Sequence, residues 1–241
     1  MATNFNENKL IRLEKHKWIV ELARGRSFID IGGLWGTTNE TVCLASKSDA
    51  KTVTMADIQP FGNKWWTAFH ERCKGFGVSD YESIRMDICD RNALDTSRKW
   101  DFIHCSGIIY HVSDPLQLIQ NLKSICMEYL IISSITIPER IENRYGILES
   151  PTGTCHLVHT MPEDRREIIR QFLEESKRNP DVVSHKTHDE LFKVNGAVKT
   201  GPWWWLYSPR TLEAMCELCG LEILRRHSTK NFSHSVLCRV V

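Results

Sequence analysis

A chain of 241 residues, 41% hydrophobic and 25% charged, is long enough for one sizeable domain with its own core. Its 31 basic and 30 acidic residues nearly cancel, so it lacks the basic excess typical of proteins that bind long stretches of nucleic acid. It has no apolar run of the ~20 residues that a membrane-spanning helix needs, and its polar N-terminal segment does not resemble a secretory signal. We therefore expect a cytoplasmic protein with reduced cysteines and no membrane partner.

The first predicted strand carries the most informative motif of the chain. A helix over residues 9–23 precedes it, and a helix-compatible stretch over 40–44 follows it. The strand itself is an apolar run that contains Asp30 and leads into a glycine cluster, Gly32, Gly33 and Gly36. Strand, glycine turn and helix together are how open α/β sheets hold a nucleotide-like cofactor beyond the carboxyl end of the first strand.

Three further strands are predicted over residues 52–58, 81–90 and 100–106, with a helix over 63–74 between the first two. Asp57 and Ile58 close the first of these strands, Asp87 and Ile88 lie near the end of the second, and Cys105 and Ser106 close the third. A carboxylate at the end of the second parallel strand is placed to accept hydrogen bonds from both hydroxyls of a ribose.

The remaining chain predicts one irregular insertion between regular elements. A helix begins at Asp114-Pro115, and an almost continuously apolar strand covers 129–137. Residues 138–202 are too long for a simple connection and contain a charged helix over about 162–177, so we expect an insertion that covers the cofactor and shapes the substrate site. A helix over 208–220 and an antiparallel edge hairpin, 221–226 and 233–241, complete a single domain over 1–241.

The glycine turn distinguishes between cofactors. A dinucleotide fingerprint requires G-x-G-x-x-G, and Leu34 occupies the second glycine position counted from Gly32, where the backbone has to admit a pyrophosphate. This argues against NAD and FAD. S-adenosylmethionine carries no phosphate and tolerates a side chain at that position, so we predict S-adenosylmethionine as the cofactor.

With these motifs the sequence resembles the class I S-adenosylmethionine-dependent methyltransferases over most of its length. The resemblance implies a Rossmann-like, seven-stranded, mostly parallel sheet with helices on both faces and a reversed last strand. The family's D-x-G-x-G-x-G turn is kept as Asp30, Gly32 and Gly36, with Leu34 as the departure. By resemblance, Asp57 would hold the ribose and Asp87 the adenine amino group. The other cofactor-binding residues predicted with them are Gly33, Ile58, Ile88, Cys105 and Ser106.

A narrower likeness covers Gly107-x-x-Tyr110-His111-x-x-x-Pro115, which is similar to a stretch of the methyltransferases related to the tRNA wobble-uridine modifying enzymes. The pair Lys17-Trp18 is similar too, which would place Lys17 near the methionine carboxylate. Because these relatives include enzymes that act on small molecules and sugars, we predict methyl transfer to an O or N atom of a small molecule. A tRNA uridine-modifying alkyltransferase and a non-catalytic binding module with the same fold are the alternatives.

Two groups of side chains are candidates for the chemistry at the substrate. His111 follows the fourth strand and could act as a base or orient the substrate, with packing against the cofactor or capping of a turn as the alternative. Tyr110 beside it could contact the cofactor or donate to the substrate, with ordinary packing as the alternative. Trp203, Trp204 and Trp205 are consecutive, and alternate side chains of a strand point to opposite faces. At least one of them should therefore line a pocket or an interface, with core packing as the alternative.

Three other features are given structural interpretations. Two H-x-x-H pairs, His156 with His159 and His185 with His188, have no accompanying acidic cluster, so we predict no metal site. Arg165, Arg166 and Arg170 are predicted to form a solvated helix face that could meet an acidic substrate or a tRNA backbone. The C-x-x-C pair at 216–219 is interpreted as buried helix packing. The oligomeric state is not predicted.

Overall fold

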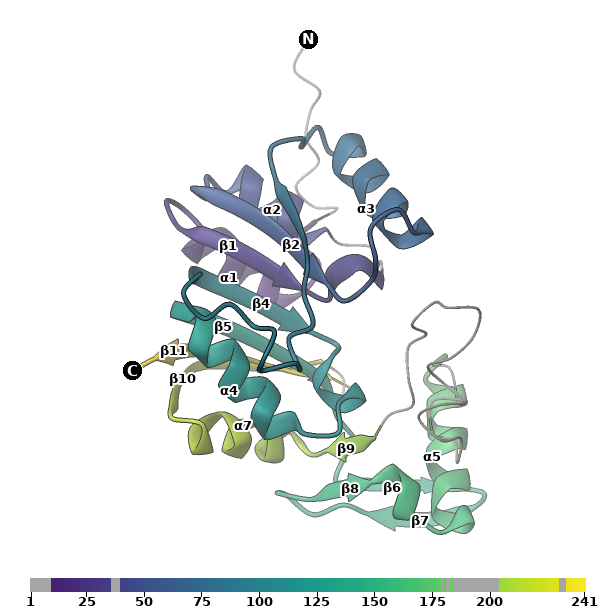
Figure 1. The fold of residues 1–241 in the computed structure, drawn as a ribbon. Helices are drawn as coiled ribbons and strands as arrows, with labels where there is room; N and C mark the ends of the chain where they lie inside the picture. The colour runs from purple at the N-terminus through teal and green to yellow at the C-terminus, as the bar shows by residue number, and fades with distance from the viewer. Residues whose placement is uncertain (1–9, 36–39, 179, 181–182, 184–203, 230–232) are drawn as a thin grey trace.

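A seven-stranded sheet forms the centre of the computed structural model, which describes residues 10–35, 40–178, 180, 183, 204–229 and 233–241. The strand order is β10-β11-β5-β4-β1-β2-β3 (Figure 1). The bounds are β1 Ser27–Ile31, β2 Thr52–Asp57, β3 Glu82–Arg85, β4 Trp100–Ser106, β5 Cys126–Ile135, β10 Leu221–Thr229 and β11 Ser233–Val240. Strands β1 to β5 pair in parallel, whereas β11 is antiparallel to both β5 and β10. The predicted sheet, its reversed last strand and its edge hairpin are confirmed.

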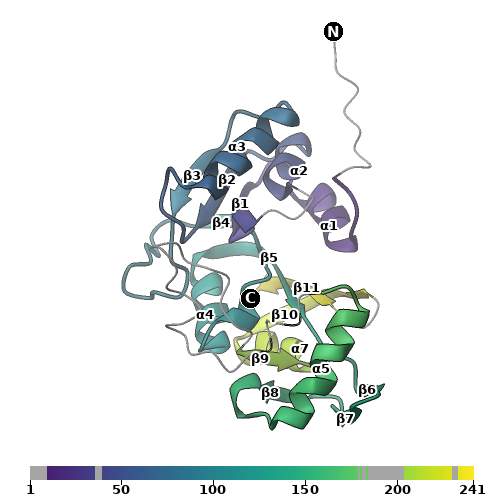
Figure 2. The ribbon, with the colours of Figure 1, turned by 90° about the vertical axis from the view of Figure 1, so that its right-hand side faces the viewer.

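Helices cover both faces of this sheet, as predicted. Successive side chains of each strand point to opposite faces of the sheet. Phe28 and Phe102 therefore face one core, and Ile29 and Ile103 face the other. Figure 2 shows the two groups of helices on opposite sides of the sheet. The first face packs against α1 Glu14–Leu22, α2 Thr41–Lys47 and α3 Lys64–Gly75, and the second against α4 Pro115–Ile125 and α7 Pro209–Leu218.

The helices α4 and α7 begin at N-cap side chains that the sequence predicted. Asp114 accepts a hydrogen bond from the Gln117 backbone N at 2.9 Å and caps α4, and Ser208 accepts one from Thr211 N at 3.4 Å and caps α7. The strand ends are less regular. Strand β3 is shorter than predicted, because β2 is its sole neighbour and the last bond of that pairing runs from Met86 N to Asp57 O.

The insertion contains regular structure that the sequence pattern did not reveal. In the structure the insertion extends beyond residue 202, and its elements are the hairpin β6 Arg140–Asn143 and β7 Gly146–Glu149, the strand β8 Cys155–Leu157, the helix α5 Glu163–Glu175 and the strand β9 Trp205–Tyr207. Strand β9 pairs with β8, and Tyr207 forms a bridge to Thr136 at the end of β5. The predicted solvated arginine face was wrong for Arg166, which is only 1% exposed and pairs with Glu163 at 2.6 Å.

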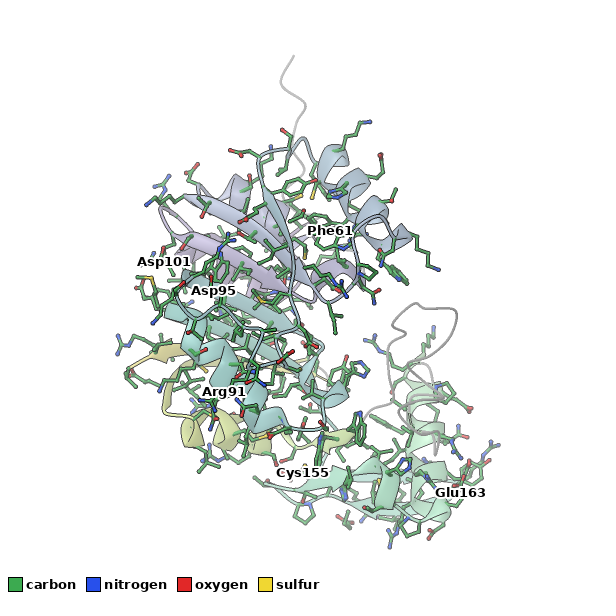
Figure 3. The ribbon with its side chains drawn as sticks, in the orientation of Figure 1. Phe61, Arg91, Asp95, Asp101, Cys155 and Glu163 are labelled. Atoms are coloured by element: carbon green, nitrogen blue, oxygen red, sulfur yellow. The ribbon has the colours of Figure 1, made fainter. Side chains whose placement is uncertain are left out.

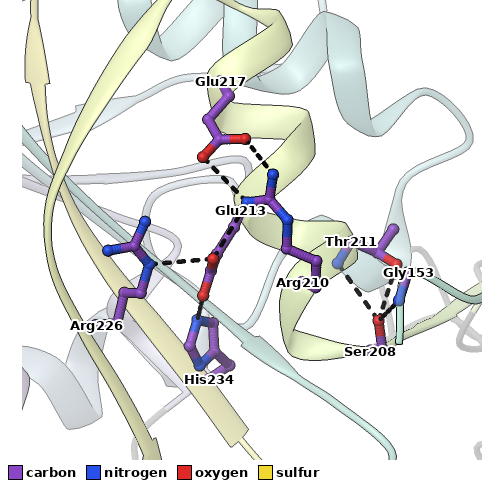
Figure 4. A network of polar contacts seen from close by, with 8 residues as sticks. All are labelled: Gly153, Ser208, Arg210, Thr211, Glu213, Glu217, Arg226 and His234. Atoms are coloured by element: carbon purple, nitrogen blue, oxygen red, sulfur yellow. Dashed lines mark hydrogen bonds and ion pairs between the residues drawn. The ribbon is translucent and has the colours of Figure 1, made fainter. Parts of the chain in front are cut away.

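A polar network fixes α7 against the hairpin and the insertion (Figure 4). The Glu213 carboxylate contacts His234 Nε2 at 3.1 Å and Arg226 Nε at 3.0 Å, which ties α7 to both hairpin strands. At the start of the same helix, Ser208 Oγ accepts a hydrogen bond from Gly153 N at 2.9 Å. The insertion is therefore anchored where it rejoins the sheet, next to β9.

Two expectations concern features outside any site. None of the helices in the described part of the chain has the length and apolar content needed to cross a bilayer. All nine cysteines are free thiols, as expected. Cys216 of the C-x-x-C pair is fully buried on the core side of α7, which confirms the packing interpretation for that residue.

Candidate active site

The carboxyl ends of β1, β2 and β4 meet at one edge of the sheet, where the glycine turn lies. Gly32 N donates to Ala56 O at 2.8 Å, which fixes the turn against β2. Gly32 has a φ of +78°, and a Cβ on it would lie 2.3 Å from Ile108 Cδ1. A Cβ on Gly33 would lie 2.2 Å from Asp30 Oδ2. The backbone conformation favours glycine at position 32, and a side chain at position 33 would displace the Asp30 carboxylate; Gly36 lies outside the described residues.

The acids at the opposite end of the strands have a structural role. Asp101 at the start of β4 accepts hydrogen bonds from Ser27 N at 2.8 Å and Ser27 Oγ at 2.7 Å, which locks β1 and β4 together. Figure 3 shows Asp101 and Asp95 far from the insertion, in which Cys155 and Glu163 are labelled. Among the acids at the ends of the described sheet strands, those near the carboxyl edge are therefore the candidates for ligand binding.

Asp57 at the end of β2 is a buried carboxylate with an unused oxygen. It is 2% exposed, and its Oδ1 accepts a hydrogen bond from Gln59 N at 2.9 Å. Its Oδ2 has no hydrogen-bond partner among the residues that the structure describes. Burial raises the pKa of Asp57 to about 6 against the lowering effect of backbone N–H groups. A buried acceptor of this kind fits a ligand that brings hydroxyl donors.

The residues predicted for adenine take different positions. Ile58 follows Asp57 and is 37% exposed, so its side chain is available as an apolar wall. Asp87 is exposed just beyond β3, and its Oδ1 accepts from Cys89 N at 2.9 Å. Ile88, by contrast, is buried in the core that α4 covers, and Asn121 Nδ2 donates to its carbonyl at 2.8 Å. The structure thus leaves Ile58 and Asp87 accessible and Ile88 as packing.

Both carboxylate oxygens of Asp30 have partners within the protein. Its Oδ1 lies 2.7 Å from His104 Nδ1, and its Oδ2 accepts a short hydrogen bond from Thr41 Oγ1. Burial opposes its ionisation, but His104, Thr41 and the cation of Lys15 together hold the pKa of Asp30 below its usual range. Sequence reasoning missed His104. The available signal was a titratable residue inside the apolar run of β4, directly across the pairing from Asp30.

The lysine at the site is Lys15. Its Nζ donates to Ser106 Oγ at 2.6 Å, at the carboxyl end of β4, and burial lowers the pKa of Lys15 to about 8. Lys17 is exposed and pairs with Glu14 at 2.8 Å, and Trp18 is 2% exposed in the core. Lys15 and the buried Trp18 are three residues apart on one side of the helix, and Lys17 is three residues from its partner Glu14. Cys105, next to Ser106, is buried in the core.

His16 in the same helix makes the fold sensitive to acid. Its Nδ1 accepts from the backbone N of Arg12 and of Leu13, both at 3.2 Å, and burial lowers the pKa of His16 to about 3. The unfolded chain binds a proton near pH 6.5, so the stability that His16 contributes is present above that pH and lost as the pH falls. We expect the free energy of unfolding to fall by about 2 kcal/mol from this residue between pH 6.5 and pH 5.

The measurement is urea unfolding at a series of pH values for wild type and His16→Asn. Asparagine keeps an acceptor at the position of Nδ1 but does not titrate, so the variant should show a shallower pH dependence. Equal slopes for the two proteins would contradict this account of His16.

The described members of the predicted catalytic and substrate residues, Tyr110, His111, Trp204 and Trp205, lie in two neighbouring segments. The Ile109–His111 turn follows β4, with the rings of Tyr110 and His111 4.3 Å apart. Trp204 N donates to Tyr110 O at 2.8 Å, and Trp205 Nε1 donates to Val112 O at 2.9 Å. The insertion is therefore joined to this turn through its tryptophan segment. Trp204 and Trp205 are partly exposed, and Trp203 lies outside the described residues.

The histidine pairs of the insertion show no metal-ligand arrangement within the described ranges. His156 Nε2 lies 3.0 Å from Ser150 Oγ, and no group of three or more potential ligands is found in that part of the chain. His185 and His188 lie outside the described residues.

Comparison with known proteins agrees with the fold. Solved structures similar to this chain include a SAM dependent methyltransferase from Aquifex aeolicus, at a TM-score of 0.52 and 15% identity over 95% of this chain and 89% of that one. Another is magnesium protoporphyrin IX methyltransferase from Synechocystis PCC 6803 with bound SAH, at 0.53 and 13% over 94% and 80%. A third is an O-methyltransferase family protein from Burkholderia thailandensis, at 0.57 and 11% over 93% and 55%.

At such identities these likenesses concern the fold alone. No match was found among curated proteins. A family model described as "Methyltransferase domain", however, matches residues 7–226, which is nearly the whole chain. The chain therefore belongs to the methyltransferase-domain family.

Proposed function

We propose that this protein transfers the methyl group of S-adenosylmethionine to an oxygen or nitrogen atom of a small molecule. The observation that carries the proposal is the buried Asp57 Oδ2, which has no partner within the described residues and lies at the same sheet edge as the Gly32–Gly33 turn. A ribose diol supplies hydroxyl donors to such a carboxylate. A phosphate-free cofactor also suits a turn that carries Leu34.

The other groups at the edge suit the remaining parts of the cofactor. The Lys15 ammonium, held on Ser106, is placed to pair with the methionyl carboxylate. Ile58 offers an apolar surface to the adenine ring, and Asp87 an acceptor to its amino group. When bound, S-adenosylmethionine supplies a methyl group activated by a positively charged sulfur. The tasks left to the protein are to align the acceptor, to exclude water and to remove a proton.

His111 is our candidate for the proton-removing or substrate-orienting group. It follows β4, one strand from the glycine turn, and its neighbour Tyr110 is hydrogen-bonded through its carbonyl to Trp204. Trp204 and Trp205, which are hydrogen-bonded to the carbonyls of Tyr110 and Val112 on either side of His111, are our candidates for an aromatic wall of the substrate site. An aromatic surface favours a small organic acceptor, and it also suits a sulfonium through cation–π contact.

Calorimetry with S-adenosylhomocysteine tests the cofactor part of the proposal. We expect saturable binding with one site per chain, and the absence of binding at millimolar ligand would overturn it. A total tRNA preparation, titrated at 50 mM and at 200 mM salt, tests the substrate class. For a small-molecule enzyme we expect no salt-sensitive binding, whereas affinity that falls by about 10³-fold or more over this range would favour the tRNA alternative.

A further inference from the structure

The face of the sheet under α1 and α2 is apolar except at its carboxyl end. There Asp30 and His104 are paired in register on β1 and β4, with 2.7 Å between Asp30 Oδ1 and His104 Nδ1. Both side chains are 5% exposed. One register position earlier on this face, Phe28 and Phe102 pack edge to face. The core therefore changes abruptly from aromatic to ionisable at the edge that holds the glycine turn.

Packing alone does not explain this histidine. Burial lowers the pKa of His104 despite the opposing effect of Asp30, and its Nδ1 faces Asp30 Oδ1 at 2.7 Å, where a proton on Nδ1 is donated to the carboxylate. Its Nε2 is buried with no hydrogen-bond partner in the described part of the structure. A buried, half-satisfied imidazole is costly, and an apolar side chain of similar size would avoid this cost. The benefit must come from what the ring does to Asp30.

Besides His104, the Asp30 carboxylate has Thr41 and Lys15 as neighbours at the edge of the sheet. Its second oxygen, Oδ2, accepts a hydrogen bond from Thr41 at the start of α2. The same oxygen lies 2.2 Å from the position that a Cβ on Gly33 would take. The positive charge of Lys15 helps to lower the pKa of Asp30, yet the Lys15 ammonium donates its hydrogen bond to Ser106 Oγ at 2.6 Å. With His104 and Thr41 as donors, the carboxylate is satisfied without taking the lysine.

We propose that His104 is a positioning residue: it occupies the Asp30 carboxylate and thereby leaves the Lys15 ammonium on Ser106, at the edge where the cofactor carboxylate binds. This inference rests on the proposed function for its ligand. Without the His104 donor, the buried carboxylate draws Lys15 inward as its replacement partner, and the cation is lost from the edge.

The test compares His104→Phe with His104→Asn. Phenylalanine fills the site but removes the donor, whereas the amide of asparagine keeps a donor at the position of Nδ1. We expect His104→Phe to weaken S-adenosylhomocysteine binding by about tenfold or more, and His104→Asn to bind within about threefold of wild type. His234→Phe, which replaces another buried histidine of the same sheet, should leave the affinity unchanged.

A second readout does not involve the cofactor. The rate of Lys15 acylation by acetic anhydride, followed by peptide mass spectrometry, reports how much free amine the side chain presents. In His104→Phe we expect a rate at least about threefold lower, because an ammonium paired with a buried carboxylate is harder to deprotonate. Thermal melts of all variants establish that the folded state persists.

The outcomes separate the two claims. Failure of the wild type to bind S-adenosylhomocysteine would remove the proposed function, and the acylation rates would still decide the role of His104. Unchanged acylation of Lys15 in a folded His104→Phe variant would overturn the positioning role. Equal affinities of wild type and His104→Phe would do the same, with the proposed function intact.

Discussion

Asp57→Asn should weaken S-adenosylhomocysteine binding by about 100-fold, which corresponds to the loss of roughly two charge-assisted hydrogen bonds. Among the described carboxylates of the edge, Asp57 is the one that is both buried and left with a free acceptor oxygen. Asparagine keeps an oxygen for the Gln59 N–H but removes the charge that a diol would contact. Isothermal titration calorimetry at pH 7.5 measures the change.

The same substitution should stabilise the protein. Burial raises the pKa of Asp57 to about 6, above the value near 3.9 of an unfolded aspartate, so its ionised form opposes folding at neutral pH. We expect the free energy of unfolding of Asp57→Asn to rise by about 3 kcal/mol at neutral pH. Asp80→Asn, which changes an exposed carboxylate before β3, is the matched control and should alter neither quantity. Retained affinity in a folded Asp57→Asn would argue against the ribose assignment.

Affinity for S-adenosylhomocysteine should also pass through a maximum between about pH 6 and about pH 8. Asp57, with its pKa raised by burial to about 6, loses its charge as the pH falls through that value. Lys15, with its pKa lowered by burial to about 8, loses its charge as the pH rises through that value. Each loss removes one partner of the ligand, so each limb approaches a tenfold change per pH unit.

Two variants show which residue causes the acid limb and which the alkaline limb of this pH dependence. Asp57→Asn should abolish the acid limb and keep the alkaline one. Lys15→Arg keeps a cation that does not titrate below pH 12, so the alkaline limb should become shallower. What remains of that limb in Lys15→Arg belongs to the amino group of the ligand itself. An alkaline limb identical in wild type and Lys15→Arg would show that Lys15 does not pair with the ligand.

Local chemistry made much of the fold predictable. Apolar runs of strand length, Asp114-Pro115 and Ser208-Pro209 as helix starts, and Gly32 with Gly33 as a turn all act over a few residues, so their meaning is the same in sequence and structure. The position of Asp57 at the end of β2 follows from the same rules. The hairpin β6–β7 and the β8–β9 pair were missed, because strands of three or four residues leave too short a pattern.

The sequence by itself determined the order along the chain of the seven strands of the central sheet and of the helices that cover it, and which acids lie near the strand ends, because both follow from periodicity and neighbouring turn residues. Only the tertiary structure decided what those acids do. The Asp30 carboxylate is hydrogen-bonded to His104, which lies 74 residues away in the sequence and is brought opposite Asp30 by the β1–β4 register. Lys15 rather than Lys17 reaches the edge, because the rotation of α1 is set by its buried Trp18. Such pairings depend on packing between distant segments, which no local pattern records.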